Sequence, residues 1–373
     1  MAKNDHAIVV GIARYPDPDF GDLGSPENDA NAFYEWLISP EGGDVPKGNI
    51  ELIVSSQFHP PFASRSDALP STAEVHRALD RLHDHANQNA KAGNGMKIGR
   101  RLYLFFSGHG FSPTEDNEAA VYMANVDRTS MAYHILGKYN ADWFFNAGCF
   151  DEVLLFMDCC RQRELISSLN RPYEPVYDRE APDRVKKLYA FATQWNKNTR
   201  ERQIGEVTRG VFTTALIAGL KGAAAGPDGR ITTTTLQEFL IQHMGQFMTP
   251  EDKEDPHISN QPDIYPYPKE GPGFVIREVV QPPVGIVQTV TQFFSPAKPE
   301  APRYPVVLRT SNGNIGKKIQ ILDFELKQVD AAVAAQETRF NLQRGLYVVQ
   351  VESNAQPMVV EVTGAPGEVD VPI

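Results

Sequence analysis

Short runs of apolar residues, each closed by glycine or by polar residues, recur along the first half of the chain. Runs without alternation are typical of strands buried on both faces. Between them, apolar residues return every three or four positions, which is the helical period. Strands that alternate with helices predict a mostly parallel sheet covered on both faces. The five predicted strands span residues 7–12, 50–54, 102–106, 153–157 and 188–192.

Two helix starts are visible as capping patterns. Ser25 followed by Pro26 predicts an N-cap and a proline at the first helical position. Ser71 and Glu74 have the spacing of a capping box. Three histidines on this second helix lack the spacing of a metal-binding pair and are interpreted as surface residues: His76, His83 and His85. Further helices are predicted at about 212–220 and 236–244.

The composition changes near residue 281. Residues 281–302 are rich in proline, which is typical of a semi-rigid linker. Residues 303–373 hold only short β-type runs, and Asn312-Gly313 has the sequence of a hairpin turn. The chain is therefore predicted to have an α/β domain at 1–280, the linker, and a small all-β, immunoglobulin-like sandwich at 303–373.

Charge and cysteine content restrict the class of protein. The net charge is −11, which disfavours a nucleic-acid or anionic-membrane surface. The three cysteines, of which two are adjacent, form no disulfide framework and indicate a reducing compartment. The N-terminal residues lack the apolar segment of a signal peptide, and no apolar run is long enough to span a bilayer. We therefore expect a cytoplasmic protein.

Two predicted strands end in residues that suit catalysis. Residues 102–106 are followed by Ser-Gly-His109-Gly, and residues 153–157 by Asp-Cys-Cys160-Arg. Active sites of parallel α/β sheets lie beyond the carboxyl ends of the strands. If the two strands are neighbours, His109 and Cys160 meet there and can supply the imidazole and thiolate of cysteine catalysis. Taken singly, each is more often structural; together they favour the catalytic interpretation. Cys149 has no partner motif and is assigned no role.

The chain resembles caspase-like peptidases. Within that family it is more similar to metacaspases and bacterial orthocaspases than to animal caspases. The resemblance covers about residues 5–280. It rests on four stretches, in the family's order: Asn28-Asp29-Ala30, Ser107-Gly108-His109-Gly110, Asp158-Cys159-Cys160 and Gly210-Val211-Phe212-Thr213.

The resemblance implies a thiol protease in which His109 is the base and Cys160, rather than Cys159, the nucleophile. The backbone N–H groups of Gly110 and Cys160 would form the oxyanion hole. Asp29 and Asp158 would line the pocket for the residue before the cleaved bond (P1), with Ser107 beside them, and would select Arg or Lys. The alternative for Asp29 is a plain role in the first helical turn.

Two departures from the family are notable. Arg161-Gln162-Arg163 replaces the usual His-Ser-Gly, and arginines beside Cys160 either lower its pKa or face solvent or an intersubunit contact. Residues 115–118 are acidic but lack the family's calcium pattern, so we interpret them as a solvated loop and expect no metal or other cofactor. Residues 161–187 form a long polar stretch, which in the caspase-like family links the large and small subunits; an enzyme that cuts after basic residues could process itself there, and the alternative is an ordinary surface loop. The candidates are Arg171, Arg179, Arg184, Lys186 and Lys187, with residues 197–202 as a second region.

Three functions are compatible with the sequence. The favoured one is an endopeptidase acting on proteins or peptides with a basic P1 residue; peptidases of this type often act in cell-death or defence pathways. The alternative is a catalytically silent scaffold that binds a partner through its β module, although retention of both His109 and Cys160 argues against it. A thiol hydrolase or transferase with a non-peptide substrate is least favoured. In each case the β module is a candidate site for a regulatory partner.

Overall fold

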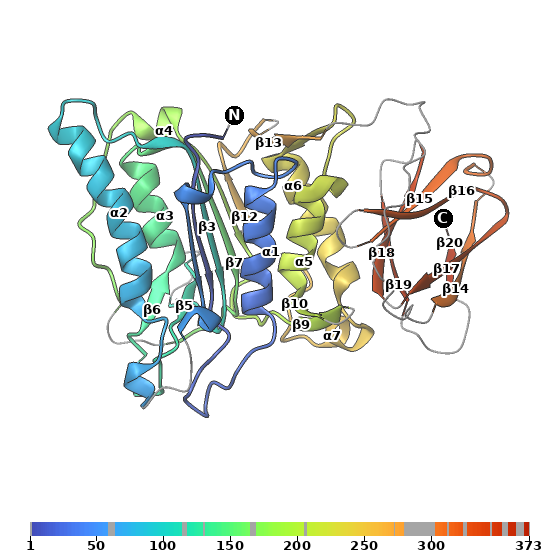
Figure 1. Ribbon diagram of the computed structural model, residues 1–373, viewed down its shortest axis with the longest axis horizontal. Coiled ribbons are helices and arrows are strands. Elements are labelled where there is room, and N and C mark those ends of the chain that lie inside the picture. Colours follow the sequence, from blue (N-terminus) through green and yellow to red (C-terminus); the bar gives the residue numbers. More distant parts are fainter. Residues whose placement is uncertain are drawn as a thin grey trace, which may run out of the picture. The chain divides into compact units, whose positions relative to one another are not determined.

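The structure is a computed structural model that describes residues 2–58, 64–113, 118–129, 131–164, 169–204, 207–271, 273–279, 303–311, 313–323, 327–343, 345–352, 357–362 and, for the backbone alone, 369–372. The chain divides into two compact units (Figure 1). The first comprises residues 1–224 with 231–277, and the second 225–230 with 278–373. The predicted linker at 281–302 lies outside the described residues.

A six-stranded sheet forms the centre of the first unit. All five predicted strands are confirmed, and they pair in parallel. The sixth strand lies antiparallel at one edge and was missed, because Pro266 interrupts its pattern; proline is tolerated on an edge strand. In spatial order the strands are β12 (Asp263–Tyr267), β8 (Lys186–Phe191), β7 (Phe150–Asp158), β3 (Gly99–Ser107), β1 (His6–Gly11) and β2 (Ile50–Val54).

Helices cover both faces of this sheet, as predicted (Figure 1). On one face lie α1 (Pro26–Ile38), α5 (Val211–Ala218) and α6 (Thr233–His243); on the other lie α2 (Thr72–Lys91) and α3 (Gly137–Asn146). The Ser71 capping box is confirmed. Helix α3 was not predicted; it begins at a glycine and its N-cap residue makes no side-chain capping bond.

The histidines of α2 differ from the surface interpretation at one position. His85 is exposed, but His83 is buried, with its ring 3.9 Å from that of Trp143. Burial lowers the pKa of His83 to about 4. His83 therefore packs as a neutral ring between α2 and α3.

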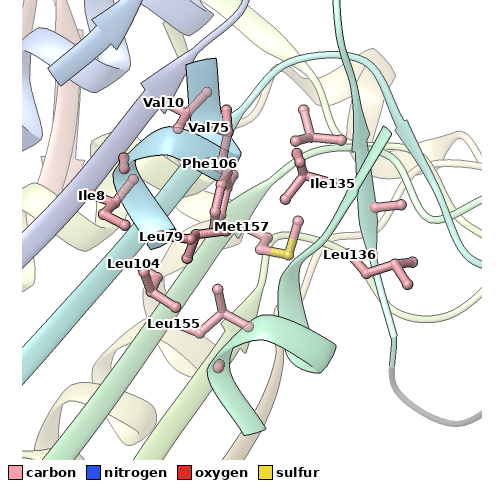
Figure 2. Packing of buried hydrophobic residues seen from close by; sticks show 14 of the residues in the cluster. Ile8, Val10, Val75, Leu79, Leu104, Phe106, Ile135, Leu136, Leu155 and Met157 are labelled. Carbon is pink, nitrogen blue, oxygen red and sulfur yellow. The ribbon is translucent and has the colours of Figure 1, made fainter. Parts of the chain in front are cut away.

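The core has two layers, one on each face of the sheet. Figure 2 shows alternate residues of β1, β3 and β7, including Val10, Phe106 and Met157, packed with Val75 and Leu79 of α2. The residues between them point to the opposite face. There the ring of Phe33 on α1 stacks on Phe105 at 4.7 Å and meets the edge of Phe156 at 5.6 Å.

The remaining elements of the first unit are short. A three-stranded sheet contains β4 (Gly110–Phe111), β5 (Ala120–Tyr122) and β6 (His134–Leu136), and a hairpin contains β9 (Glu201–Ile204) and β10 (Val207–Gly210). β11 (Arg230–Thr232) pairs with β13 (Val275–Glu278). Short helices are α4 (Ala181–Arg184) and α7 (Pro250–Glu254), with helical turns at Lys47–Asn49, Ser55–Phe58, Arg65–Asp67, Gly219–Ala223 and Met244–Phe247.

The second unit is a two-sheet sandwich, as predicted. One sheet has the order β16 (Gln328–Val333), β15 (Lys318–Asp323), β18 (Gly345–Val351) and β19 (Met358–Val362). The other has the order β17 (Glu337–Gln343), β14 (Arg303–Arg309) and β20 (Val369–Pro372). Apolar residues from both sheets form one core.

The hairpin predicted at Asn312-Gly313 is wrong. Asn312 itself lies outside the described residues, and the strands before and after it, β14 and β15, belong to different sheets. The chain crosses between the sheets at this point, so the pattern marked a turn but not a hairpin. Among the described residues, every helix is too short or too polar to span a bilayer.

Candidate active site

The pairing of β3 with β7 brings the two candidate catalytic residues to the same end of the sheet. Ser107 pairs with Asp158, and the Gly108 N–H donates to the Asp158 carbonyl at 3.3 Å. His109 and Cys160 each stand two residues beyond this last pair. Strand order and register therefore place both at the carboxyl edge, where parallel α/β proteins form their sites.

The loop between β1 and α1 holds His109. The backbone N–H of His109 donates to the hydroxyl of Tyr15 at 3.0 Å, and that hydroxyl in turn donates to the Tyr122 carbonyl at 3.2 Å. Nε2 of the imidazole lies 3.2 Å from the Gly21 carbonyl. Because a carbonyl only accepts, Nε2 carries the proton and Nδ1 is left as the basic nitrogen. The edges of Tyr15 and Phe20 contact the ring.

The same surroundings set the protonation of His109. Burial lowers its pKa, whereas the carbonyls of Gly21 and Phe20 and the charge of Glu201 act in the opposite direction. The imidazole is thus neutral in the resting protein near pH 7, as a general base must be.

The two adjacent cysteines differ sharply in environment. Cys159 is buried in the apolar core, while Cys160 is partly exposed. A Cβ at position 110 would lie 2.6 Å from the Cβ of Cys159 and 2.8 Å from its Sγ, so only glycine fits there. Gly110 thereby brings the backbone after His109 directly against the chain that carries Cys160.

Cys160 rests as a thiol. Burial is the main cause that raises its pKa, and the charge of Asp158 adds to it. A backbone hydrogen bond from Thr199 and the charge of Arg200 oppose the rise. The thiolate must therefore form by proton transfer rather than stand ready.

Two buried carboxylates converge beside this pair. Asp29 accepts the Gly210 N–H on both oxygens, at 3.0 and 3.1 Å, and the Ser107 hydroxyl at 3.2 Å. Asp158 accepts the N–H and hydroxyl of Thr213 at 3.0 and 2.7 Å. A Cβ at position 210 would lie 2.1 Å from Asp158 and 2.9 Å from Asp29, so both carboxylates face this glycine.

The acid pair carries little compensating charge. Among the described residues, neither Asp29 nor Asp158 forms an ion pair with Lys or Arg. Burial raises the pKa of both carboxyls, and the charge of Asp158 raises that of Asp29 further. Such a pair favours a proton or a cation between its members.

Comparison with known families identifies the class of protein to which the chain belongs. Residues 4–262, more than half of the chain, match the model of the caspase domain of peptidases. The chain belongs to the caspase-domain peptidase family. Its helix-flanked sheet is the caspase-like fold, and the predicted fold class is confirmed.

Individual relatives are distant. A probable protease from a Desulfuromonadales bacterium is 29% identical over 226 residues, which are 58% of this caspase-domain chain and 26% of that protein. The chain thus spans about a quarter of that relative's length. Caspase-1 of Spodoptera frugiperda is 14% identical with a TM-score of 0.44, covering 71% of this chain and 86% of its own. A Geobacter sulfurreducens protein is 15% identical with a TM-score of 0.41, covering 70% and 93%.

Arg161, next to the candidate nucleophile of this caspase domain, points away from it. It is fully buried, pairs with Asp263 at 2.8 Å, donates to the Thr193 carbonyl at 3.0 Å and lies over the ring of Phe191. The idea that arginines beside Cys160 lower its pKa is wrong for Arg161, since the structure directs this charge into the core.

The acidic segment after the histidine motif is only partly described. Residues 114–117 lie outside the described residues. Glu118 is buried and accepts the N–H groups of Ala119, Lys138 and Tyr139 at 2.8–3.0 Å. Burial raises its pKa to about 7. Glu118 therefore caps the start of α3, and among the described residues no cluster of His, Cys, Asp and Glu could hold a metal ion.

The self-processing candidates lie in different settings. Lys186 and Lys187 are part of β8, and Arg184 in α4 forms an ion pair with Asp178. Arg171 and Arg179 are exposed and lie outside helices and strands. Arg171 is followed by Pro172, and its guanidinium lies 5.9 Å from the centre of the Tyr139 ring.

Sequence reasoning missed the groups that support the site. Each of these groups lies far in sequence from the site residue or loop that it contacts, and no motif marks it. They are Tyr15, Gly21, Thr199 and Glu201. Ser25 was predicted to cap α1, but its side chain makes no capping bond; Glu201, 176 residues away, accepts its N–H instead.

Asp29→Asn is expected to stabilise the protein above neutral pH. A raised folded-state pKa means that the buried carboxyl contributes stability at low pH and loses it as pH rises through that pKa. Removing the charge should raise Tm at pH 8 by about 2–4 °C, roughly 1 kcal/mol, and the gain should fade near pH 4. Thermal unfolding across pH measures this, with Asp84→Asn on the exposed side of α2 as the control. A lower Tm for Asp29→Asn than for the wild type at pH 8 would contradict a raised pKa of the Asp29 carboxyl.

Alkylation of Cys160 by iodoacetamide should accelerate with pH through a midpoint above the ordinary thiol value of about 8.5, because burial raises its pKa. Mass spectrometry of the folded protein resolves each cysteine, and the buried Cys149 and Cys159 should stay unmodified. A rate that is already maximal below pH 7 would show instead a resting thiolate–imidazolium pair.

Proposed function

We propose that this caspase-domain protein is a cysteine endopeptidase with a His109–Cys160 dyad, and that it cleaves after Arg or Lys in the manner of metacaspases. The observation that carries the proposal is the convergence, at the end of the β3–β7 pair, of the dyad with two buried carboxylates. A thiol, an oriented neutral imidazole and an anionic pocket are the parts that such a reaction needs.

In the first half-reaction, Nδ1 of His109 takes the proton of the Cys160 thiol, and the sulfur attacks the carbonyl carbon of the scissile bond. The imidazolium then gives this proton to the departing amine as the C–N bond breaks, which leaves a thioester. The Gly21 carbonyl on Nε2 keeps the ring in the required tautomer throughout.

Backbone N–H groups are the proposed oxyanion donors. The close approach of Gly110 to Cys159 supports pairing the N–H of Gly110 with that of Cys160 around the developing oxyanion. In the second half-reaction, His109 takes a proton from water, the hydroxide attacks the thioester, and the thiol of Cys160 is restored as the acid product leaves.

The acid pair supplies the specificity. A guanidinium or ammonium between Asp29 and Asp158 would replace the proton that burial favours and would satisfy both carboxylates. The Ser107 hydroxyl, bonded to Asp29, fixes one side of this pocket. Arg suits the site better than Lys because its planar fork can bond two carboxylates at once.

Self-processing is proposed at the bond after Arg179. The β8 lysines lie in the central sheet, where cleavage would require unfolding of the strand. The bond after Arg171 leads into Pro172, whose ring removes the N–H and fixes φ. Arg179 is exposed, and only a short turn around Asp178 must open before its bond becomes extended.

Peptides with a fluorogenic group after Arg, Lys or Asp test the proposal. We expect Arg to be cleaved fastest, then Lys, with Asp left uncut. Cys160→Ala and His109→Ala should each reduce kcat/KM by about 10³-fold or more. Asp158→Asn should lose about 10²-fold with Arg, because an amide leaves the cation unpaired.

Cys159→Ala is the matched control and should keep activity, since Cys159 packs in the core. Activity that survives in Cys160→Ala but disappears in Cys159→Ala would overturn the nucleophile assignment. Cleavage of the Asp peptide would overturn the proposed role of the carboxylates.

During storage the wild-type protein should yield a fragment that ends at Arg179, as identified by mass spectrometry of the intact pieces. Arg179→Ala and Cys160→Ala should each abolish it, whereas Arg171→Ala should not. A fragment that begins at Pro172, or one that persists in Cys160→Ala, contradicts this assignment.

A further inference from the structure

Glu201 makes an unusual set of hydrogen bonds for an exposed side chain. Its carboxylate accepts the Gly24 N–H at 3.0 and 3.2 Å on its two oxygens, and the Ser25 N–H at 2.9 Å. It is the first residue of β9 and pairs with Gly210, the residue that donates to Asp29. One carboxylate thus connects the hairpin beside the acid pair to the start of α1.

The segment held by Glu201 is the one that orients the imidazole. Gly24 and Ser25 end the loop that begins after β1, and the Gly21 carbonyl in this loop faces Nε2 of His109. The Leu23 N–H donates to the Ala13 carbonyl, so the loop is closed on itself between these points. Gly24 lies three residues after Gly21 at the end of this closed loop, so the contact with Glu201 adds to the bonds that fix the position of Gly21.

The carboxylate is matched to this position in two ways. It lies at the N-terminus of α1, where backbone N–H groups lack partners and a negative charge is favoured. Its charge also acts on His109 and favours the imidazolium, the form that appears when the thiol is deprotonated. Ser25, the residue that sequence would assign to capping, makes no side-chain capping bond and donates its N–H to this carboxylate.

We propose that Glu201 is a positioning residue for His109: by fixing Gly24 and Ser25, it holds the Gly21 carbonyl on Nε2 and joins the hairpin beside the acid pair to the base. The expected effect of Glu201 on turnover rests on the proposed function. The contact itself concerns the orientation of the imidazole and can be tested without any substrate.

The kinetic test compares Glu201→Ala and Glu201→Gln with Glu35→Ala; Glu35 is an exposed glutamate of α1 and serves as the control. With an Arg peptide, Glu201→Ala should lower kcat by about ten-fold and leave KM within about two-fold. Glu201→Gln should retain more activity, about a third of the wild-type kcat, because its amide oxygen still accepts one N–H. Glu35→Ala should match the wild type.

The substrate-independent test follows the imidazole of His109 by ¹H–¹⁵N NMR, with its signals identified by their loss in His109→Gln. The wild type should show the Nε2–H tautomer, and Glu201→Ala should lose the downfield Nε2–H signal. Glu201→Gln should lower the pKa of His109, since removal of a negative charge disfavours the imidazolium.

The outcomes separate the two proposals. If the wild type cleaves no peptide yet the His109 signals change in both Glu201 variants, the proposed function fails and the positioning role stands. Identical His109 signals in the wild type and both variants overturn the positioning role, whatever the activity. A rise in KM with unchanged kcat also overturns it, because Glu201 would then contribute to substrate binding. If Glu201→Ala does not fold, Glu201→Gln alone decides.

Discussion

The parallel pairing of β3 with β7 is the constraint on which the site depends. It fixes not only that His109 and Cys160 meet but also which side chains point where. Side chains of a strand alternate between its two faces, so Phe156 and Asp158 share one face and Met157 lies on the other; just beyond the strand, Cys159 belongs to the same apolar cluster as Met157, whereas Cys160 is partly exposed. The second face packs under α2 and is closed, as Figure 2 shows for Met157. Of the two adjacent cysteines, Cys159 is therefore buried and Cys160 remains partly exposed.

The same alternation explains why a carboxylate is buried on the face of the sheet that α1 covers. Ser107 and Asp158 follow Phe105 and Phe156, which pack on Phe33, so they lie at the end of an apolar layer. A carboxylate there is costly unless hydrogen bonds satisfy it. Donors from Gly210, Thr213 and Thr199 do so without supplying a positive charge. The fold thus stabilises the carboxylates as acceptors without an ion pair, with only the more distant charge of Arg209 acting on Asp29, and this differs from a structural ion pair such as that of Arg161 with Asp263.

The sequence predicts what local pattern determines. Apolar runs gave the five parallel strands, the capping box gave α2, and polar residues at strand ends indicated His109 and Cys160. The family order chose Cys160. Elements without a strong local signal were missed: α3 lacks a side-chain cap, and β12 contains proline. The misjudged residues, His83 and Arg161, are polar side chains buried by partners that lie far away in sequence, and Glu201 reaches the start of α1 in the same way.

The missed contacts have a common electrostatic consequence. Burial pushes both members of the dyad toward their neutral forms, raising the pKa of Cys160 and lowering that of His109. The groups that oppose burial favour the charged forms: the Thr199 backbone and the charge of Arg200 at the sulfur, and the carbonyls of Gly21 and Phe20 and the charge of Glu201 at the imidazole. Three of these five are consecutive residues, Thr199 to Glu201, and the other two, Phe20 and Gly21, lie in the loop whose end at Gly24 is bonded to Glu201. In the proposed mechanism, residues 199–201 thus support both charges that proton transfer would create, and Glu201 pairs with Gly210, which faces the proposed cation site. In the proposed mechanism, catalysis therefore depends on that short segment as well as on His109 and Cys160.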